Sequence, residues 1–358
     1  MTRGRTFMGV ATTAALLATL AACGGGDSSP STQSSTTTVA GNNVPGVLYP
    51  LTGLVSTDPI AAGRMALAVK IDNHPNARPQ TGLNKTDIVF EENVEGITRF
   101  IAVFHSQGSD PVGPIRSGRT QDIDLLSSFN KPLFAWSGGN ANVTRAVNSS
   151  SLVNVGHSAS KGKGGYFRSQ DRKAPHNLYA QTKDLWSLAP EGSGPPPVQF
   201  TFRGDSDANP ATSTPLDGAK VSMTGLKVFW KWNGVEKNFV RFTENSRRQL
   251  EPHVSDDVQV NTKNVIVLYA TYERSAADSK SPHAVTVGKG TGFILTNGGL
   301  IEMKWERANA EKPFTFTDTA GAVIRLTPGR TWVEVSRRNS LAAVGIGVDP
   351  ASVAWPVP

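Results

Sequence analysis

Residues 69–104 read VKIDNHPNARPQTGLNKTDIVFEENVEGITRFIAVF. Apolar and β-branched runs at Leu67–Ile71, Asp87–Val94 and Arg99–His105 lie in or beside this stretch, and clusters rich in Gly and Pro separate them. Runs of this length and composition between turn-forming residues are typical of β-strands. The stretch therefore predicts three strands, with a polar loop directly after the first one.

Helices are expected downstream of these strands. Apolar residues recur three apart in Gln121–Phe129, and this spacing predicts a helix. A second helix is expected from about Asn142, and a third after Thr182, which would be its N-cap, ending before Pro190. Because strands alternate with helices, region 47–190 is predicted to be α/β or α+β.

The rest of the chain has a different pattern. Residues 191–215 are rich in Pro and polar residues and predict a linker. Region 216–337 has a hydrophobic period near two, with hairpin turns such as Asn297-Gly298-Gly299, and predicts a β-meander or a small barrel. Residues 338–358 are expected to be a tail. The expected strands are Lys227–Trp232, Asn238–Phe242, Asn264–Tyr272, Ala284–Val287, Gly292–Leu295, Leu300–Trp305, Val323–Leu326 and Trp332–Val335.

The N-terminus carries a targeting signal. Two arginines precede the apolar stretch Phe7–Ala22, which is short and rich in alanine, and Leu20-Ala21-Ala22-Cys23-Gly24 has the form of a bacterial lipobox. Residues 1–22 are therefore predicted to be a lipoprotein signal peptide, Cys23 to receive lipid chains such as palmitate, and residues 23–46 to be a flexible Gly/Ser/Thr tether. The alternative is an ordinary secretory signal that contains a cysteine. Lipidation would anchor the chain to the extracytoplasmic face of the cell membrane.

Composition excludes several classes of protein. The 358 residues are 38% hydrophobic, enough for folded cores, and 36 Lys+Arg against 29 Asp+Glu give a net charge of +7. This charge is spread along the chain and lacks the clustering typical of a nucleic-acid binder, so we expect no nucleic-acid partner. A single cysteine excludes a disulfide framework, and the six histidines lack metal-ligand spacing. We expect no cofactor and no metal site.

Several unusual motifs in the expected order resemble one bacterial family. They are residues 69–104, Gly113–Arg119, Tyr166–Tyr179, Asn264–Tyr269 and Leu326–Trp332. Together they resemble the YerB-like lipoproteins, a family without an assigned biochemical function. The resemblance covers roughly residues 48–335. It implies an α+β fold, in which an N-terminal layered α/β sandwich of mixed sheet with helices is followed by a C-terminal all-β domain, meander or barrel-like. Glu92 departs from the family pattern, where a small or apolar residue is expected.

Two glutamates of the second strand are candidates for a site. Strict alternation places Glu91 and Glu95 on the same face, opposite Glu92. They would then be an acid/base pair of the kind that glycosidases use. The alternative, which we favour, is that both acids form ion pairs with Arg99, Arg116 or Arg119. Glu92 on the apolar face is expected to find a partner or to lie at the sheet edge.

Two further segments are candidates. The loop Asp72-Asn73-His74-Pro75 follows a strand, with Arg78 nearby, and is either part of a site or an Asx-type turn. The run Lys161–Lys173, with His176 beyond it, interleaves cations with aromatic residues. It is either a binding surface for carboxylates or phosphates or a solvated loop.

We expect these groups to meet in one polar cleft. The candidate residues are Asp72, Asn73, His74, Arg78, Glu91, Glu95, Arg99, Arg116, Arg119, Arg168, Arg172 and His176. Arginines outnumber any catalytic set, which favours a binding or scaffold role at the cell envelope, with an anionic cell-wall component or a wall-synthesis protein as the partner. The alternative is a hydrolase of glycosidic or phosphodiester bonds that uses Glu91 and Glu95, or Asp72 and His74. The sequence leaves enzymatic activity open.

Overall fold

A computed structural model describes residues 46–204 and 206–358. The predicted signal peptide, Cys23 and all but the last residue of the predicted tether lie outside the described residues. Within the described part, no helix has both the length and the apolar character needed to cross a membrane.

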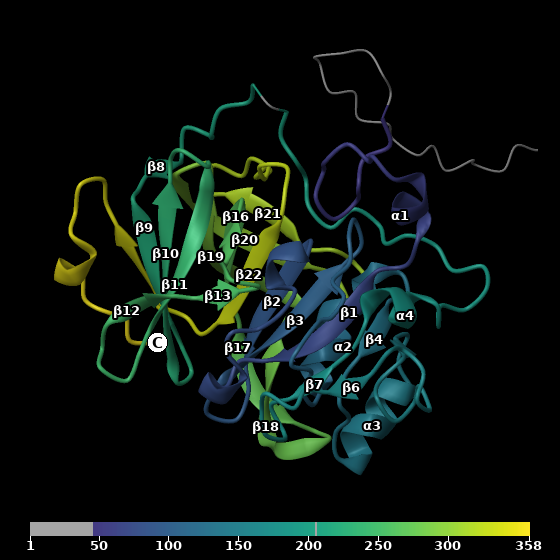
Figure 1. Cartoon of the computed structure of the whole chain (residues 1–358). Helices are drawn as coiled ribbons and strands as arrows, with labels where there is room; N and C mark the ends of the chain where they lie inside the picture. Colours follow the sequence, from purple (N-terminus) through teal and green to yellow (C-terminus); the bar gives the residue numbers. More distant parts are fainter. Residues whose placement is uncertain (1–45, 205) are drawn as a thin grey trace, which may run out of the picture. The chain divides into compact units, whose positions relative to one another are not determined.

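One mixed sheet runs through both halves of the described chain (Figure 1). Its strand order is β21-β20-β19-β16-β22-β2-β3-β1-β4-β5, with β8 beside β20. The strands are β1 Leu67–Asp72, β2 Ile88–Asn93, β3 Thr98–Phe104, β4 Leu133–Ala135, β5 Val153–Asn154, β8 Thr214–Pro215, β16 Asn264–Tyr269, β19 Gly288–Thr296, β20 Gly299–Arg307, β21 Thr315–Asp318 and β22 Thr331–Ser336. The three strands expected around residues 69–104 are confirmed as β1, β2 and β3.

Strands β2 and β22 join the N-terminal and C-terminal sequence regions within the main sheet. β2 pairs in parallel with β22, from Ile88 opposite Thr331 to Glu92 opposite Val335. Regions 47–190 and 216–337 therefore differ in sequence pattern but share one sheet, because hydrogen bonds of the main sheet connect them. The described residues 46–204 and 206–358 belong to one compact unit.

A second, antiparallel sheet packs on the main sheet. Its order is β12-β11-β10-β9-β23, with β15 beside β11. The strands are β9 Gly218–Met223, β10 Leu226–Asn233, β11 Asn238–Glu244, β12 Leu250–Pro252, β15 Asn261–Thr262 and β23 Leu341–Val344. Strand β23 lies in the segment expected to be a tail, so that segment is partly incorporated in the fold. The short pairs are β6 Phe167–Arg168 with β7 Leu178–Tyr179, β13 Val254–Ser255 with β14 Val258–Gln259, and β17 Thr271–Ser275 with β18 Asp278–Val285.

The helices are short and most lie in the N-terminal region. They are α1 Pro59–Gly63, α2 Thr120–Leu126, α3 Ala141–Asn148 and α4 Thr182–Trp186, with 3-10 turns η1 Pro75–Ala77, η2 Leu83–Lys85, η3 Ser127–Phe129 and η4 Pro350–Ser352. The helix expected at Gln121–Phe129 is confirmed as α2 with η3, and the one expected near Asn142 as α3.

Two local predictions are wrong. The N-cap of α4 is Gln181, because the Thr182 hydroxyl is engaged elsewhere, accepting from Ser109 N at 2.8 Å and donating to Asp110. Val323–Leu326 forms isolated bridges, to Thr317 and Phe202, rather than a strand. In both cases long-range partners override the local pattern.

The main sheet is the middle layer, with a core on each face. On one face, Ile88 and Phe90 pack against side chains of α2 and α3. On the other, Val89 packs with residues of the second sheet, among them Trp230. This confirms the predicted alternation along β2 and the α+β class. It also means that both faces of β2 are covered, so every polar side chain on this strand must find a partner inside the protein.

We expect residues 46–194 and 216–358 to fail to fold when they are expressed separately. Without β22, β2 is an open edge, and the face that carries Val89 loses its cover. Circular dichroism and thermal unfolding of each fragment, against the intact chain, measure this. A cooperative unfolding transition from either fragment by itself would contradict the shared sheet.

Candidate functional site

Three polar segments meet near the C-terminal end of β1: the loop 72–79, the loop 113–119 and the segment that contains Arg172. Asp72 N donates to Pro114 O at 2.9 Å, and Arg116 N donates to Lys70 O at 2.8 Å, which places the 113–119 loop along the strand. Arg172 Nη2 donates to Pro79 O at 2.6 Å. The sheet thus brings together the motif segments that lie far apart in the sequence.

Asp72 is at the centre of the contacts at this end of β1. Its carboxylate is fully buried; one oxygen accepts the His74 backbone N–H at 3.0 Å, and the other lies 2.7 Å from His176 Nδ1 and 3.1 Å from Arg116 Nε. The His74 ring stacks on His176 with a centroid separation of 4.4 Å, and its Nδ1 accepts from Asn76 N as the cap of η1. The imidazole that contacts Asp72 therefore belongs to His176, and the use of Asp72 and His74 as acid and base stays a prediction.

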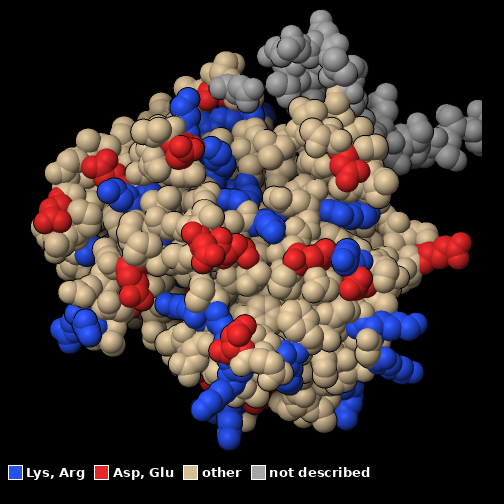
Figure 2. Space-filling view, in the orientation of Figure 1, with Lys and Arg blue, Asp and Glu red and all other residues tan. Residues whose placement is uncertain are grey.

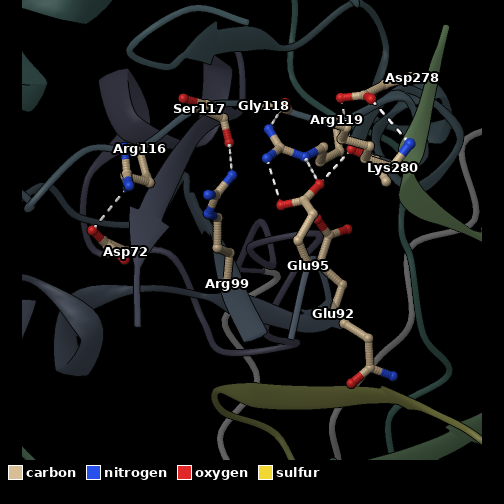
Figure 3. A network of polar contacts seen from close by, with 12 residues as sticks. Asp72, Glu92, Glu95, Arg99, Arg116, Ser117, Gly118, Arg119, Asp278 and Lys280 are labelled. Atoms are coloured by element: carbon tan, nitrogen blue, oxygen red, sulfur yellow. Dashed lines mark hydrogen bonds and ion pairs between the residues drawn. The ribbon is translucent and has the colours of Figure 1, made fainter. Parts of the chain in front are cut away.

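Arg116, Arg99 and Arg119 follow one another in this order beside the end of β1, and we call them the arginine row (Figure 3). Arg99 lies on β3, opposite Asp72 of β1 in the register. It is 5% exposed and its Nη1 donates to Ser117 O at 2.9 Å, which holds the 113–119 loop. Among the described residues it has no ion-pair partner, and its Nε has no acceptor.

The charges of the row act on one another. Burial, followed by the positive charges of Arg119 and Arg116, lowers the pKa of Arg99 to about 10. Arg99 remains charged at neutral pH, since this pKa is still well above 7. A buried guanidinium beside two like charges is a strained electrostatic arrangement that an anion would relieve.

Glu95 lies at the end of the row. Arg119 Nε and Nη2 each donate to its carboxylate at 2.7 Å (Figure 3). Ser281 Oγ also donates to this carboxylate. Burial raises the pKa of Glu95, but the hydrogen bonds from Arg119 and Ser281 outweigh this and bring it down to about 2. The predicted pairing of Glu95 with an arginine of this group is present in the structure.

Glu91 does not join Glu95, and the predicted acid/base pair is wrong. Glu91 is fully buried and accepts from Thr98 Oγ1 at 2.7 Å, Asn73 Nδ2 at 3.2 Å and Arg241 Nη2 at 2.7 Å. Strand β2 ends at Asn93, and the turn that follows removes Glu95 from the alternation. The arginine that pairs with Glu91 comes from β11 and was not predicted, because nothing near Arg241 in the sequence indicates it.

A buried polar cluster surrounds Glu91. Glu334 lies opposite it in the β2–β22 register and accepts from Trp230 Nε1 at 2.8 Å. Burial and the negative charge of Glu91 raise the pKa of Glu334 well above its usual range. The Arg241 guanidinium lies over the rings of Trp332, Phe100 and Trp230 at 5.1, 5.7 and 5.8 Å. We call Glu91, Glu334 and Arg241 the inter-sheet cluster, because it joins the main sheet to the second sheet.

Glu92 has the partner that its position requires. It forms an ion pair with Lys70, which also donates to Asp122 Oδ1 at 2.7 Å, and all three side chains are fully buried. Burial and the negative charge of Asp122 outweigh the attraction of Lys70 and raise the pKa of Glu92 to about 8. Asp122 in turn accepts the Arg119 backbone N–H at 2.8 Å. The cluster of Lys70, Glu92 and Asp122 therefore supports the arginine row.

The remaining candidates point away from the row. Arg78 donates to Asn73 and Thr243, and Arg78 and Asn73 line a groove of about 950 Å³ against the second sheet. Arg168 lies on exposed β6 and donates to Asn177. The expected single cleft is therefore wrong, because the candidates divide among the C-terminal end of β1 at Asp72, the groove, the exposed strand β6 and the interior.

The amino-acid sequence matches both parts of one family. Residues 51–194 match the N-terminal domain described as "Protein of unknown function (DUF3048)", and residues 219–333 match its C-terminal domain. The chain belongs to the DUF3048 family. A relative in Bacillus subtilis (strain 168), named "Putative lipoprotein YerB", is 28% identical over 309 residues, which cover 83% of this chain and 88% of the relative.

A solved structure has the same fold. The crystal structure of the YerB protein from Bacillus subtilis matches with a TM-score of 0.70 and 23% identity, over 83% of this chain and 99% of that chain. These matches confirm the resemblance to the YerB-like lipoproteins. DUF3048 is a family of unknown function, so it provides the fold, and the chemistry must be argued from the site. In the described residues of this DUF3048 protein, no three His, Cys, Asp or Glu side chains gather as a metal site requires.

We expect Arg241→Met to lower the free energy of unfolding by about 3–5 kcal/mol, because it leaves the Glu91 carboxylate buried without its cation. The matched control is Lys289→Met. It breaks a Lys289–Glu306 pair whose side chains are 76% and 56% exposed, and should cost less than about 1 kcal/mol. Urea unfolding of both variants measures the difference. Equal losses in the two variants would contradict the role given to the inter-sheet cluster.

We expect Glu92→Gln to gain stability relative to the wild type as the pH rises from 5 to 8. The pKa of Glu92 is about 8 in the folded chain, above the roughly 4.3 of an unfolded Glu. The wild type therefore loses stability across this window, at up to about 1.4 kcal/mol per pH unit, and the amide does not. Urea unfolding at pH 5, 6.5 and 8 measures this, with Glu302→Gln as the control for loss of one surface acid. A constant difference at all three pH values would refute it.

Proposed function

We propose that this DUF3048 protein is lipid-anchored at the extracytoplasmic face of the cell membrane and binds an anionic component of the cell wall through the arginine row. The anchor is supported by the lipobox at Leu20–Gly24 and by the name of the Bacillus subtilis relative. The folded part then lies on the side of the membrane where wall polymers are present. Its role is binding, with the tether providing reach.

The observation that carries this proposal is the charge balance at the row. Arg99, Arg116 and Arg119 face two carboxylates, Asp72 and Glu95. Arg116 and Arg119 are partly exposed, with side-chain exposures of 24% and 12%, so a ligand can reach them. Guanidinium groups hold phosphate or carboxylate oxygens in a fork of N–H donors, and a bound anion would offset the repulsion within the row.

Mixed surface charge is consistent with recognition by a few local contacts. On the face shown in Figure 2, blue Lys and Arg side chains are interspersed with red Asp and Glu side chains. Such a surface attracts a polyanion weakly as a whole, because nearby charges of opposite sign screen one another. Affinity would then depend on the few guanidinium groups that contact the ligand directly.

The hydrolase alternative receives less support. Glu91 is enclosed against Arg241, and Glu95 is held by Arg119 and Ser281 with a pKa of about 2. A general acid must hold a proton near neutral pH, and a general base must reach the substrate. Glu91 cannot reach a substrate in either role, and Glu95, with a pKa of about 2, holds no proton near neutral pH and cannot be the acid. The two glutamates therefore form no acid/base pair, and we propose binding.

We expect Arg116→Gln to weaken binding to purified cell walls about tenfold, because it removes one charge-assisted contact to the anion. The full chain in neutral detergent is sedimented with the walls at several salt concentrations. The control is Arg325→Gln, which removes the same charge from an exposed position that contributes nothing to the row.

Arg325→Gln should bind as the wild type does, and Arg116→Gln should also show a shallower salt dependence. Thermal unfolding confirms that both variants are folded. Equal binding by all three proteins would overturn the proposal, as would binding that persists after the phosphate- and carboxylate-bearing polymers are stripped from the walls, which would indicate a protein partner.

A further inference from the structure

A pocket of about 540 Å³ lies beyond the end of the arginine row. It is an open pocket, lined by the turn at residues 94–96, the β17–β18 hairpin and Arg337. Its floor includes Tyr272, whose hydroxyl donates to Val335 O at 2.5 Å and accepts from Asn93 N. The Arg337 guanidinium lies 4.9 Å from the centre of the Tyr272 ring, which orients it over the pocket.

The pocket and the row share a wall. Glu95 lines the pocket, and its carboxylate is held from the other side by Arg119. Ser281 of the hairpin lines the pocket as well and donates to the same carboxylate. In Figure 3, Arg116, Arg99, Arg119 and then Lys280 follow one another across the view. The row and the pocket are thus consecutive parts of one surface.

The pocket carries its own positive charges. Arg274, Lys280 and Arg337 line it and are exposed. In the described ranges, none of the three has an ion-pair partner. Glu273 and Glu95 are the acids of the lining, and Glu95 is already neutralised by Arg119. A second positive site therefore follows the row, and the Arg119–Glu95 ion pair at the end of the row separates Arg99 and Arg116 from the pocket.

This order of charges selects a class of ligand. A compact anion can contact Arg99 and Arg116 or the pocket, but not both, because the neutral Arg119–Glu95 ion pair lies between them. A linear chain with negative charges separated by uncharged spacers can place one charge on the row and another in the pocket. Binding at two connected sites raises the affinity through effective concentration, without any new kind of contact.

We infer that the row and the pocket form one extended site for a linear polymer of phosphate groups joined by neutral polyol spacers. The inference rests on the proposed function and specifies its ligand. Arg274 and Arg337 provide forked donors for phosphate oxygens, and Lys280 provides a point charge. The exposed Ser279 hydroxyl in the pocket lining is available to a polyol spacer. The inference assigns the β17–β18 hairpin, in the C-terminal part of the chain, a direct role in binding.

The test measures affinity against chain length. The full chain in neutral detergent is titrated calorimetrically with glycerol phosphate, with synthetic glycerol-phosphate oligomers of increasing length, and with glutamate oligomers of matched charge. We expect the wild type to bind long glycerol-phosphate oligomers at least tenfold more tightly than glycerol phosphate itself. Glutamate oligomers should bind more weakly than glycerol-phosphate oligomers of equal charge.

Two variants separate the parts of the site. The double variant Arg274→Gln/Lys280→Gln should reduce the ratio of long-chain to short-chain affinity about tenfold, and both substituted side chains are exposed, so the fold is kept. Arg116→Gln should weaken long and short ligands together. Arg325→Gln is the control and should match the wild type.

The possible outcomes separate the extended site from the proposed function. Affinity that does not grow with length, but still depends on Arg116, overturns the extended site and leaves the proposed function standing. Binding of no probe, or binding unaffected by Arg116→Gln, overturns both. Equal affinity for glutamate and glycerol-phosphate oligomers overturns the assignment to phosphate polymers.

Discussion

The buried ion pair between Glu91 and Arg241 is the constraint on which the rest of the structure depends. Glu91 lies on the middle layer and Arg241 on the second sheet, and both side chains are fully enclosed. Separating such charges inside a protein is costly, so the two sheets must stay together wherever this pair is formed. Because the partners come from the two different family segments, the pair makes one body of them.

Glu91 and Glu92 are neighbours on β2 and act on opposite faces of it. Glu91 points to the second sheet and Arg241, while Glu92 points to the helix side, where Lys70 and Asp122 enclose it. Asp122 also accepts the backbone N–H of Arg119, which helps to place the arginine row beside the C-terminal end of β1. Glu92 is therefore connected, through Lys70 and Asp122, to the surface to which we assign binding.

The sequence predicted the elements better than the partners. Strands β1 to β3 and helix α2 were predicted from periodicity, because hydrophobic spacing reports local backbone geometry. The placement of Glu95 failed, because the alternation was extended beyond Asn93, where the strand ends. Arg241 was missed for another reason: its importance comes from the strand that faces it, and no local pattern records a long-range partner.

By itself, the sequence predicted alternating strands and helices followed by a region of strands, a lipobox-like motif at Cys23 and the choice of Asp72, Arg99, Arg116 and Arg119 as candidates, while the α+β class came from the family resemblance. These depend on periodicity and on short motifs, which operate within a few residues. The tertiary structure decided that β2 and β22 are neighbours, that Glu91 is enclosed and Glu95 is at the surface, and that a cationic pocket continues the row. Those outcomes depend on which faces of distant strands bury each other, and burial sets whether a charge is an internal support or a group that a ligand can reach.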